Sequence, residues 1–381
     1  MKFTIDRDFF ISQLNHVTRA IPSKSAIPVL TGIKLELTAQ QLTLTGSDAS
    51  ISIESMINVQ NELAQLTVIE PGSIVLSARL FTDIVKKLPT SIIEFDLQEN
   101  YSVQLTSGKA VFTIQGIDSI EYPRLPEIDT DKQLTIQGLL FKKMVNQTIF
   151  SASNQETRPI LTGLNLTFNQ NSLTAVATDS HRLSKRNLTL ANIQSQLNGE
   201  SITIPKKSVI ELTRILEDDQ VMTLYVMPQQ IVFMVENLII YSRLLEGVYP
   251  DISRLIPTAH NTQLTIKTQE FAQAIDRAAL LVHVAKSNIV QLQIEQDEVK
   301  LLVQGISVGK SVEEINYESV EGQNLTIAFN PDYMRDAVRA FGDTTIKLHF
   351  ISAERPLLLT VDQSDTDNEL IQLLTPIRTH G

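Results

Sequence analysis

The most reactive set of side chains in this sequence is a run of three residues, Asp179, Ser180 and His181. An acid, a hydroxyl and an imidazole are the groups of a hydrolytic triad, but a triad needs a hydrogen-bonding geometry that adjacent residues rarely supply. A hydrolase that uses His181 is therefore only an alternative hypothesis. The sequence predicts no catalytic residue and no enzyme.

A second interpretation makes Asp179 and His181 metal ligands on one side of a strand. The chain has six histidines, and they form no His-Glu-x-x-His motif or comparable cluster of ligands. The loop Gly-x-x-x-x-Gly-Lys-Ser/Thr, whose backbone amides cradle phosphates, does not occur either. We therefore expect no metal site and no cofactor.

The composition is that of a globular protein with several domains. Single hydrophobic cores stop growing near about 250–300 residues, so 381 residues predict two or three domains. The chain has no cysteine, which excludes disulfides and thiolate metal sites and suits a reducing cytoplasm. We find no apolar signal core at residues 1–8 and no apolar run of about 20 residues. The sequence therefore predicts a cytoplasmic protein with no membrane partner.

One pattern recurs three times along the chain. Residues 28–33 match 159–164, and residues 45–48 match 176–179, both at an offset of 131. A third, more diverged copy begins at residue 264, 130 residues beyond the similar segment at 134. Repeats of this kind indicate repeated structural units. We predict three repeated domains at 1–128, 129–258 and 259–381, separated by proline-containing linkers.

Each copy contains two predicted helices among segments that alternate with period two, as half-buried strands do. The first helix of each copy carries residues at spacings of four and three, which places them on one face. These sets are Phe10, Leu14 and Val17; Phe141, Val145 and Thr148; and Phe271, Ile275 and Ala278. The fold class is therefore α+β: three structurally repeated domains, each with two helices on antiparallel sheets.

Basic residues are concentrated in the predicted helices. Lys86, Arg214 and Arg339 occupy the same position of the second helix in the three copies, and an acidic residue precedes each by three positions. The six helical segments carry +6, so the rest of a chain with net charge −11 carries −17. If all helices face one way, their surface suits phosphate contacts that carry no sequence information. A solvated helix face with weak ion pairs is the alternative interpretation.

Four segments resemble the bacterial DNA polymerase III β subunit family, the β sliding clamps. They are residues 1–5, 28–32, 178–183 (Thr-Asp-Ser-His-Arg-Leu) and 373–378 (Leu-Leu-Thr-Pro-Ile-Arg). The resemblance covers the whole chain and implies the DNA clamp fold, with a head-to-tail homodimer whose six domains form a ring. It implies a processivity factor of the replicative DNA polymerase, which encircles duplex DNA and slides without sequence specificity.

The resemblance also implies a pocket between domains 2 and 3 that captures short peptides. The implied owners of these peptides are the DNA polymerase III α subunit, the clamp loader, other polymerases, ligase and mismatch-repair proteins. Each buried leucine or phenylalanine anchor is worth about 1.5–3 kcal/mol, which gives weak, exchangeable binding. The implied pocket residues are Leu161, Thr178, His181, Arg182, Leu183, Pro250, Arg254, Leu255, Asn330, Tyr333, Pro356, Leu373, Thr375, Ile377 and Arg378.

This sequence departs from the family pattern in the pocket. Ser180 stands where many relatives have glycine, and Thr375 stands where others have methionine. His380 and Gly381 extend past the matched end. We expect the first two differences to change the shape of the pocket and its preference among peptides.

Family similarity places a ring seam at Phe112 and Ile114, on an edge strand of domain 1, and at Leu280 and Leu281, on a helix of domain 3. An unpaired edge strand invites association, and ring closure uses that tendency. The residues expected to face DNA are Lys24, Lys86, Lys206, Arg214 and Arg339. The alternative from another class is a monomeric three-repeat scaffold that binds proteins without encircling DNA.

Overall fold

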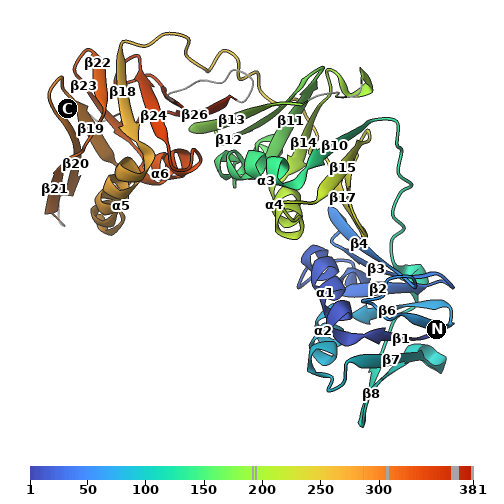
Figure 1. The fold of residues 1–381 in the computed structure, drawn as a ribbon. Helices are drawn as coiled ribbons and strands as arrows, with labels where there is room; N and C mark the ends of the chain where they lie inside the picture. Colours follow the sequence, from blue (N-terminus) through green and yellow to red (C-terminus); the bar gives the residue numbers. More distant parts are fainter. Residues whose placement is uncertain (191–192, 194, 286, 306–308, 362–368, 379–381) are drawn as a thin grey trace. The chain divides into compact units, whose positions relative to one another are not determined.

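The computed structural model describes residues 1–190, 193, 195–285, 287–305, 309–361 and 369–378, and consists of helices packed on antiparallel sheets (Figure 1). The chain forms two compact units, Met1–Leu140 with Lys207–Leu244, and Phe141–Lys206 with Leu245–Gly381. The α-helices of the described chain are α1 (Arg7–Val17), α2 (Ala78–Lys87), α3 (Gly138–Asn146), α4 (Lys206–Ile215), α5 (Thr268–Ala285) and α6 (Pro331–Arg339).

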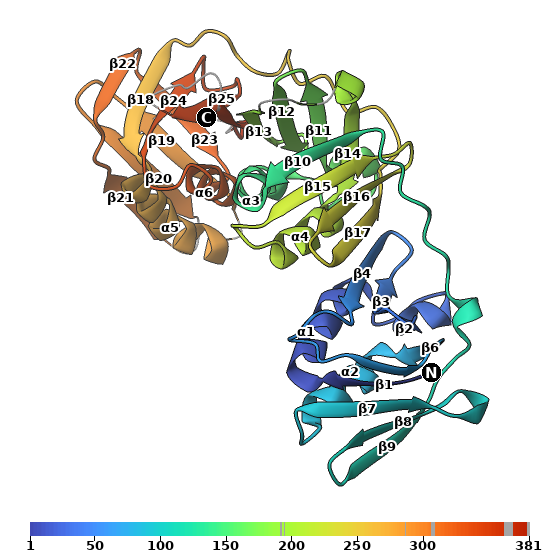
Figure 2. The same cartoon turned by 45° about the vertical axis from the view of Figure 1, so that its right-hand side comes forward.

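The first unit contains a five-stranded sheet of order β5-β1-β7-β8-β9 and an eight-stranded sheet of order β10-β15-β16-β17-β4-β3-β2-β6 (Figure 2). Their strands are β1 (Lys2–Asp6), β2 (Gly32–Leu37), β3 (Gln41–Ser47), β4 (Ile51–Asn58), β5 (Thr67–Glu70), β6 (Gly72–Ser77), β7 (Ile92–Leu97), β8 (Ser102–Ser107), β9 (Ala110–Gln115), β10 (Gln133–Gln137), β15 (Val221–Val226), β16 (Gln230–Val235) and β17 (Leu238–Arg243).

The second unit contains a nine-stranded sheet of order β14-β11-β12-β13-β26-β25-β24-β18-β22 and a four-stranded sheet of order β21-β20-β19-β23. Their strands are β11 (Gly163–Asn169), β12 (Ser172–Thr178), β13 (Arg182–Thr189), β14 (Ser201–Pro205), β18 (Thr262–Lys267), β19 (Val290–Ile294), β20 (Val299–Gly305), β21 (Gly309–Glu314), β22 (Ser319–Gly322), β23 (Leu325–Phe329), β24 (Thr345–Phe350), β25 (Leu357–Val361) and β26 (Leu370–Leu374).

The strand orders contain the same two half-sheets three times. The first half-sheet occurs as β1-β7-β8-β9, β10-β15-β16-β17 and β18-β24-β25-β26. The second occurs as β6-β2-β3-β4, β14-β11-β12-β13 and β23-β19-β20-β21. The threefold α+β repeat predicted from the sequence is confirmed. The predicted limits near residues 128 and 258 fall in segments outside helices and strands and stay predictions.

Consecutive repeats are joined by main-chain pairing at two junctions. In the first unit β4 pairs with β17, and in the second unit β13 pairs with β26, both antiparallel. We call these pairings, with the side chains around them, the 1–2 junction and the 2–3 junction. The middle repeat therefore contributes one half-sheet to each unit.

The helices form where the sequence pattern places them. The Asp6 carboxylate accepts from the amide of Phe9 at 2.9 Å and caps α1, and Asn330 caps α6, which begins with Pro331. The predicted apolar faces are buried. Thr148, the polar exception, lies just past the end of α3, and its buried hydroxyl donates to the carbonyl of Met144 at 2.7 Å.

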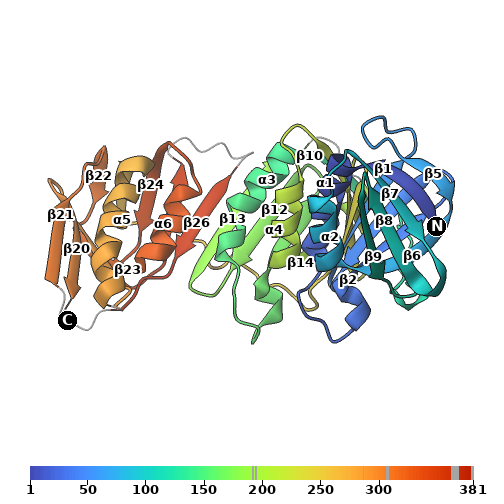
Figure 3. The same cartoon turned by 90° about the horizontal axis from the view of Figure 1, so that it is seen from below.

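Within each unit the helices cover one face of the sheets. Figure 3 shows α1 and α2 in front of the strands of the first unit, and α5 and α6 in front of those of the second. The α6 helix is anchored through buried Met334, Ala337 and Val338. Each helix thus buries its apolar face and leaves its polar face, with the recurring basic residues, open to solvent.

Candidate peptide-binding site and nucleic-acid interface

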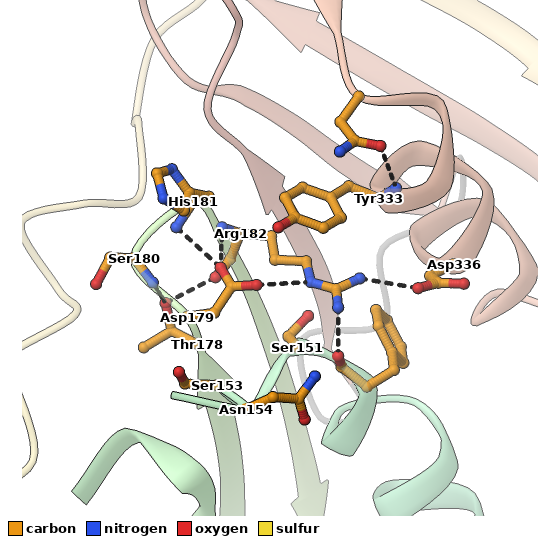
Figure 4. A network of polar contacts seen from close by, with 12 residues as sticks. Ser151, Ser153, Asn154, Thr178, Asp179, Ser180, His181, Arg182, Tyr333 and Asp336 are labelled. Carbon is orange, nitrogen blue, oxygen red and sulfur yellow. Dashed lines mark hydrogen bonds and ion pairs between the residues drawn. The ribbon is translucent and has the colours of Figure 1, made fainter. Parts of the chain in front are cut away.

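The predicted peptide site is centred on the turn between β12 and β13, which its own side chains fix (Figure 4). The Thr178 hydroxyl donates to the carbonyl of Arg182 at 2.7 Å and accepts from the amide of Ser180 at 3.2 Å. The Asp179 carboxylate accepts from the amides of His181 and Arg182 at 2.9 and 3.0 Å. Ser180 has a φ of 78°, in the left-handed region that glycine adopts without strain.

The Arg182 guanidinium connects this turn to two other elements (Figure 4). Its Nε donates to Asp179 at 3.1 Å, one Nη to Asp336 of α6 at 2.8 Å, and the other Nη to the carbonyl of Phe150 at 2.7 Å. The guanidinium carbon also lies 4.3 Å from the centroid of the Tyr333 ring, a cation–π contact. Since the side chain is only 12% exposed, these contacts are made largely out of water.

The C-terminal run lies against the same turn. The amide of Thr375 donates to the carbonyl of His181 at 2.8 Å, and the amide of Ile377 donates to the carbonyl of Ala328 in β23 at 2.8 Å. The side chains of His181 and Thr375 are exposed, and that of Ile377 is half-buried. The turn and the C-terminal run therefore present a polar edge beside the sheet.

The apolar part of the site lies on the sheet at the 2–3 junction. Leu183 and Leu373, both predicted, belong to a buried cluster. Side chains of the linker that follows β17 pack on it. The cluster is completed by Val176, Leu358 and Ile371, and the linker residues on it are Tyr249, Ile252 and Ile256. Sequence reasoning missed these six, although Val176 and Ile371 lie two positions from Thr178 and Leu373 and so share their face of the strand.

The remaining predicted pocket residues surround this cluster or lie outside it. Pro250, Arg254 and Leu255 are exposed on the linker that carries the packed residues, while Leu161 is buried in a short 3-10 helix, Pro159–Thr162. Pro356 is half-buried before β25, Arg378 is exposed, and Asn330 caps α6 next to Tyr333. His380 and Gly381 lie outside the described residues.

The basic residues predicted to face DNA differ in their exposure and in their ion pairs. Lys86, Arg214 and Arg339 are exposed on α2, α4 and α6, at matching helix positions. Arg214 pairs with Glu211 at 2.6 Å, and Arg339 pairs with Asp276 of α5 at 2.8 Å.

The other two predicted cations lie in different settings. Lys24 is exposed on a loop, whereas Lys206 is half-buried at the start of α4 and donates to Asn154 at 3.0 Å. Burial lowers the pKa of Lys206. Lys206 is therefore the least available of the predicted DNA contacts.

The residues predicted for the ring seam lie on the edge strand β9 and on the helix α5. Phe112 is 40% exposed on β9, an edge strand, whereas Ile114 on the same strand is buried. On α5, Leu280 is 68% exposed and Leu281 packs partly against the core of the third repeat. The prediction missed a second edge, β21, where Val312 is 59% exposed.

Asp179 and His181, weighed above as metal ligands, lie in the turn between β12 and β13, so the interpretation that places them on one side of a strand is wrong. Within the described ranges no three His, Asp or Glu side chains gather in a way that would hold a metal ion. Residues 305–309 have the sequence pattern Gly-x-Ser-x-Gly, but Gly305 ends β20 and Gly309 begins its antiparallel partner β21, whereas a nucleophile elbow leads from a strand into a helix; residues 306–308 lie outside the described residues. In the helices that the structure describes, no segment is long and apolar enough to cross a bilayer.

Three repeats of helices on antiparallel sheets, joined through their strands, define a DNA clamp. Family models for the DNA polymerase III beta subunit match its N-terminal domain at residues 1–126, its central domain at 135–251 and its C-terminal domain at 253–378. The chain therefore belongs to the DNA polymerase III beta subunit family, and the resemblance inferred from the sequence is confirmed.

Individual relatives agree with the family models over the full length. The beta sliding clamp of Bacillus subtilis is 40% identical and that of Streptococcus pneumoniae 41%, with 100% and 99% of each chain covered. The crystal structure of the DNA polymerase sliding clamp from Bacillus subtilis superposes with a TM-score of 0.96 at 40% identity and covers all of both chains. The DNA polymerase III beta chain of Streptococcus pneumoniae gives 0.95, with 99% of this chain and 100% of that chain covered.

Proposed function

We propose that two copies of this chain close head to tail into a six-domain ring around duplex DNA, which slides and keeps the replicative polymerase on its template. The observation that carries the proposal is the order of the strands. At each junction, the last strand of the second half-sheet in one repeat pairs with the last strand of the first half-sheet in the following repeat. These pairs are β4 with β17 and β13 with β26. Among the described strands, β21 of the third repeat and β9 of the first repeat are the corresponding strands left at sheet edges. The β21 strand of one copy can therefore pair with the β9 strand of the other.

The side chains on these edges support a seam between copies. Phe112 on β9, Val312 on β21 and Leu280 on α5 are large apolar side chains exposed in the single chain. Burying them against a second copy removes apolar area from water, worth about 25 cal/mol per Å². The closed ring then contains six strand-paired junctions of the same kind, two within each chain and one at each of the two seams.

The mass of the particle tests this seam. Sedimentation should give twice 42.5 kDa for the native protein and a monomer for Phe112→Asp combined with Leu280→Asp. A native protein that stays monomeric at all concentrations would favour the monomeric scaffold instead. Ile114→Asp is a poor choice for this test, because Ile114 is buried and its loss would unfold the sheet.

The helix cations supply the DNA-facing surface in this proposal. Lys86, Arg214 and Arg339 are exposed at equivalent positions, and contacts from such side chains to phosphate are sequence-independent and salt-sensitive. Changing all three to glutamate should shorten retention on nicked circular DNA. It should also flatten the dependence of log affinity on log salt by about 0.9 for each phosphate that the variant no longer neutralises.

A charge-matched control separates local effects from total charge. Arg124, Arg243 and Arg355 are exposed outside the helices, so their triple change to glutamate alters the net charge equally. Its retention should stay near that of the native protein. If both triple variants shorten retention on DNA equally, the helix surface is not the surface that contacts DNA.

The cluster at the 2–3 junction is the proposed docking site for partner peptides. An apolar floor with a polar edge suits an extended peptide with leucine or phenylalanine anchors. The DNA polymerase III α subunit, the clamp loader, other polymerases, ligase and mismatch-repair proteins are the partners we propose. In this account the chain works in the cytoplasm as a non-catalytic subunit, and all chemistry belongs to the proteins it tethers.

A further inference from the structure

We propose that Arg182 and Asp336 form a lock that positions the β12–β13 turn for peptide binding, with Arg182 acting as a positioning residue and not as a peptide ligand. This inference rests on the proposed peptide function of the 2–3 junction. It assigns a role to Asp336, which lies outside the predicted pocket, and gives Arg182 a different role from the polar edge first expected of it.

The contacts of Arg182 leave little of it for a ligand. Nε and both Nη atoms donate to oxygens of the protein, and the plane of the guanidinium lies on Tyr333. A planar guanidinium with five donors suits such fixed, multi-directional contacts. With 12% of its side chain exposed, Arg182 would have to give up buried partners before it could bind a peptide.

The lock joins parts of the site that come from different repeats. On one side is the turn, whose His181 carbonyl holds Thr375 and whose next strand residue, Leu183, lies in the apolar floor. On the other side is α6, which the third repeat holds through buried Met334 and Val338. Because Arg182 bridges the two, the floor and the polar edge keep a fixed relation before a peptide arrives, which reduces the entropy cost of binding.

The 1–2 junction shows how the same turn is built without this lock. Asp48 fixes the equivalent turn through the amides of Ser50 and Ile51, as Asp179 does, but the position of Arg182 is occupied there by Ile51. The tie from that turn to a helix is an ion pair of Asp48 with Lys207, whose side chain is 54% exposed. Only the junction that binds peptides in our proposal replaces an exposed lysine tie by a buried arginine.

Two substitutions and their combination test the lock. A labelled peptide ending in leucine and phenylalanine is titrated by fluorescence anisotropy into the full-length protein and into Asp336→Ala, Arg182→Met and the double variant. We expect about tenfold weaker binding for Asp336→Ala. The double variant should bind the peptide no more weakly than Arg182→Met alone, since both changes break the same lock.

Hydrogen exchange at the turn gives a readout that does not depend on peptide. The amides of His181 and Arg182 donate to Asp179, so loosening the turn in Asp336→Ala should speed their exchange while thermal melting still shows a folded protein. Arg182→Lys should not restore slow exchange, because one ammonium cannot span three acceptors. Glu211→Ala removes the equivalent acid in the first unit and should leave peptide affinity and this exchange unchanged.

The outcomes separate the lock from the pocket. If Arg182→Met weakens binding while Asp336→Ala leaves both affinity and exchange unchanged, Arg182 is a direct ligand and the lock is wrong. If the native protein binds no such peptide, the proposed pocket fails before any substitution is made, and the positioning role fails with it. Equal weakening in Glu211→Ala would also overturn the proposal, because the effect would then not be local to the 2–3 junction.

Discussion

The two junctions have the same strand pairing, yet their outer sheet faces differ in chemistry. At the 2–3 junction Val176 and Leu183 lie in the buried apolar cluster. At the 1–2 junction the equivalent positions, 131 residues earlier, are Thr45 and Ser52. Their hydroxyls are within hydrogen-bonding distance of Glu54, at 3.1 Å, and of Ser47, at 2.7 Å.

In our proposal this difference makes the 2–3 junction, and not the 1–2 junction, the site for peptides. An apolar anchor placed on Thr45, Ser52 and Glu54 would cover polar groups without offering them partners, which costs free energy. The same anchor placed beside Val176 and Leu183 meets an apolar surface and leaves water. Linker packing does not distinguish the junctions, because Leu125 and Ile128 pack on the apolar cluster of the 1–2 junction as Tyr249, Ile252 and Ile256 pack on that of the 2–3 junction.

The largest expected effect is a loss of peptide affinity when Leu183 is changed. This residue is 1% exposed in the floor of the site. Leu183→Ser gives the 2–3 junction the residue of the 1–2 junction, removes an apolar side chain and leaves an unpaired hydroxyl. We expect peptide affinity to fall by about 100-fold, since the anchor of the peptide would then lie against a hydroxyl without a partner instead of an apolar surface, a cost of about 2–3 kcal/mol. Anisotropy titration measures it, with Ser52→Ala as the matched control in the other junction. A change below threefold would contradict the assignment of the floor.

The second prediction compares the arginines of the two junctions. Arg182 is 12% exposed and pairs with Asp179, 14% exposed, as well as with Asp336, whereas Arg19 is 36% exposed and its partner Glu211, the equivalent acid, also pairs with Arg214. Arg182→Met should destabilise the protein by about 3 kcal/mol, because it leaves the largely buried Asp179 without its arginine. Arg19→Met should cost about 0.5 kcal/mol, as exposed pairs do. Urea unfolding measures the loss of stability in both variants. Equal losses would show that the two arginines do not differ in their contribution to stability.

Acid should weaken the second unit before the first. Burial and the nearby His260 lower the pKa of His349 on β24 to about 4, below its ordinary value of 6.5. Between those values the unfolded chain binds a proton that the folded chain does not, so stability declines as pH falls through 6.5 and the decline is complete below about 4. In the first unit burial lowers the pKa of His16, which weakens folding in the same direction, and raises the pKa of Glu54, which opposes it, so the net response to acid is smaller there.

Hydrogen exchange of each unit between pH 7 and 5 can show this difference. After correction for the intrinsic pH dependence of exchange, protection should decline in β24 and its neighbours and hold in β4. His349→Gln should remove most of the decline in the second unit. A loss of protection at low pH that is confined to the first unit would contradict the predicted directions of the stability changes.

The smallest expected effect concerns the two equivalent turns. Ser180 and Ala49 both have a positive φ, 78° and 73°, at matching positions of their turns. Glycine at either position should stabilise the protein by about 0.5–1 kcal/mol, because it adopts this conformation without strain. Thermal melting of Ala49→Gly and Ser180→Gly tests it. Ser172→Gly in β12 serves as the control and should destabilise.

The repeat and the fold could be predicted because they depend on local patterns. Phe10, Phe141 and Phe271 recur at offsets of 131 and 130 residues, and the spacing of the apolar residues within each helix predicts the face that is buried. The apolar floor was found only in part, since Leu358 and Tyr249 reach it by strand order and by the path of a linker. Neither of these is written in sequence spacing.

The lock was missed for a physical reason. Arg182 and Asp336 are 154 residues apart and meet only because β13 pairs with β26 and brings the third repeat beside the turn. From sequence, an arginine in a polar turn predicts an exposed side chain that is free to bind a ligand. The edge strand β21 was missed similarly, because which strand ends a sheet depends on the order of all its strands.

The most direct test of the contrast between the junctions is the footprint of a bound peptide. Amide hydrogen exchange is measured on the native protein with and without a peptide ending in leucine and phenylalanine. Our account predicts new protection at residues 176–183, 249–256 and 370–377, with no change at 45–52 and 122–128. Equal protection at both junctions, or protection at the 1–2 junction alone, would contradict it.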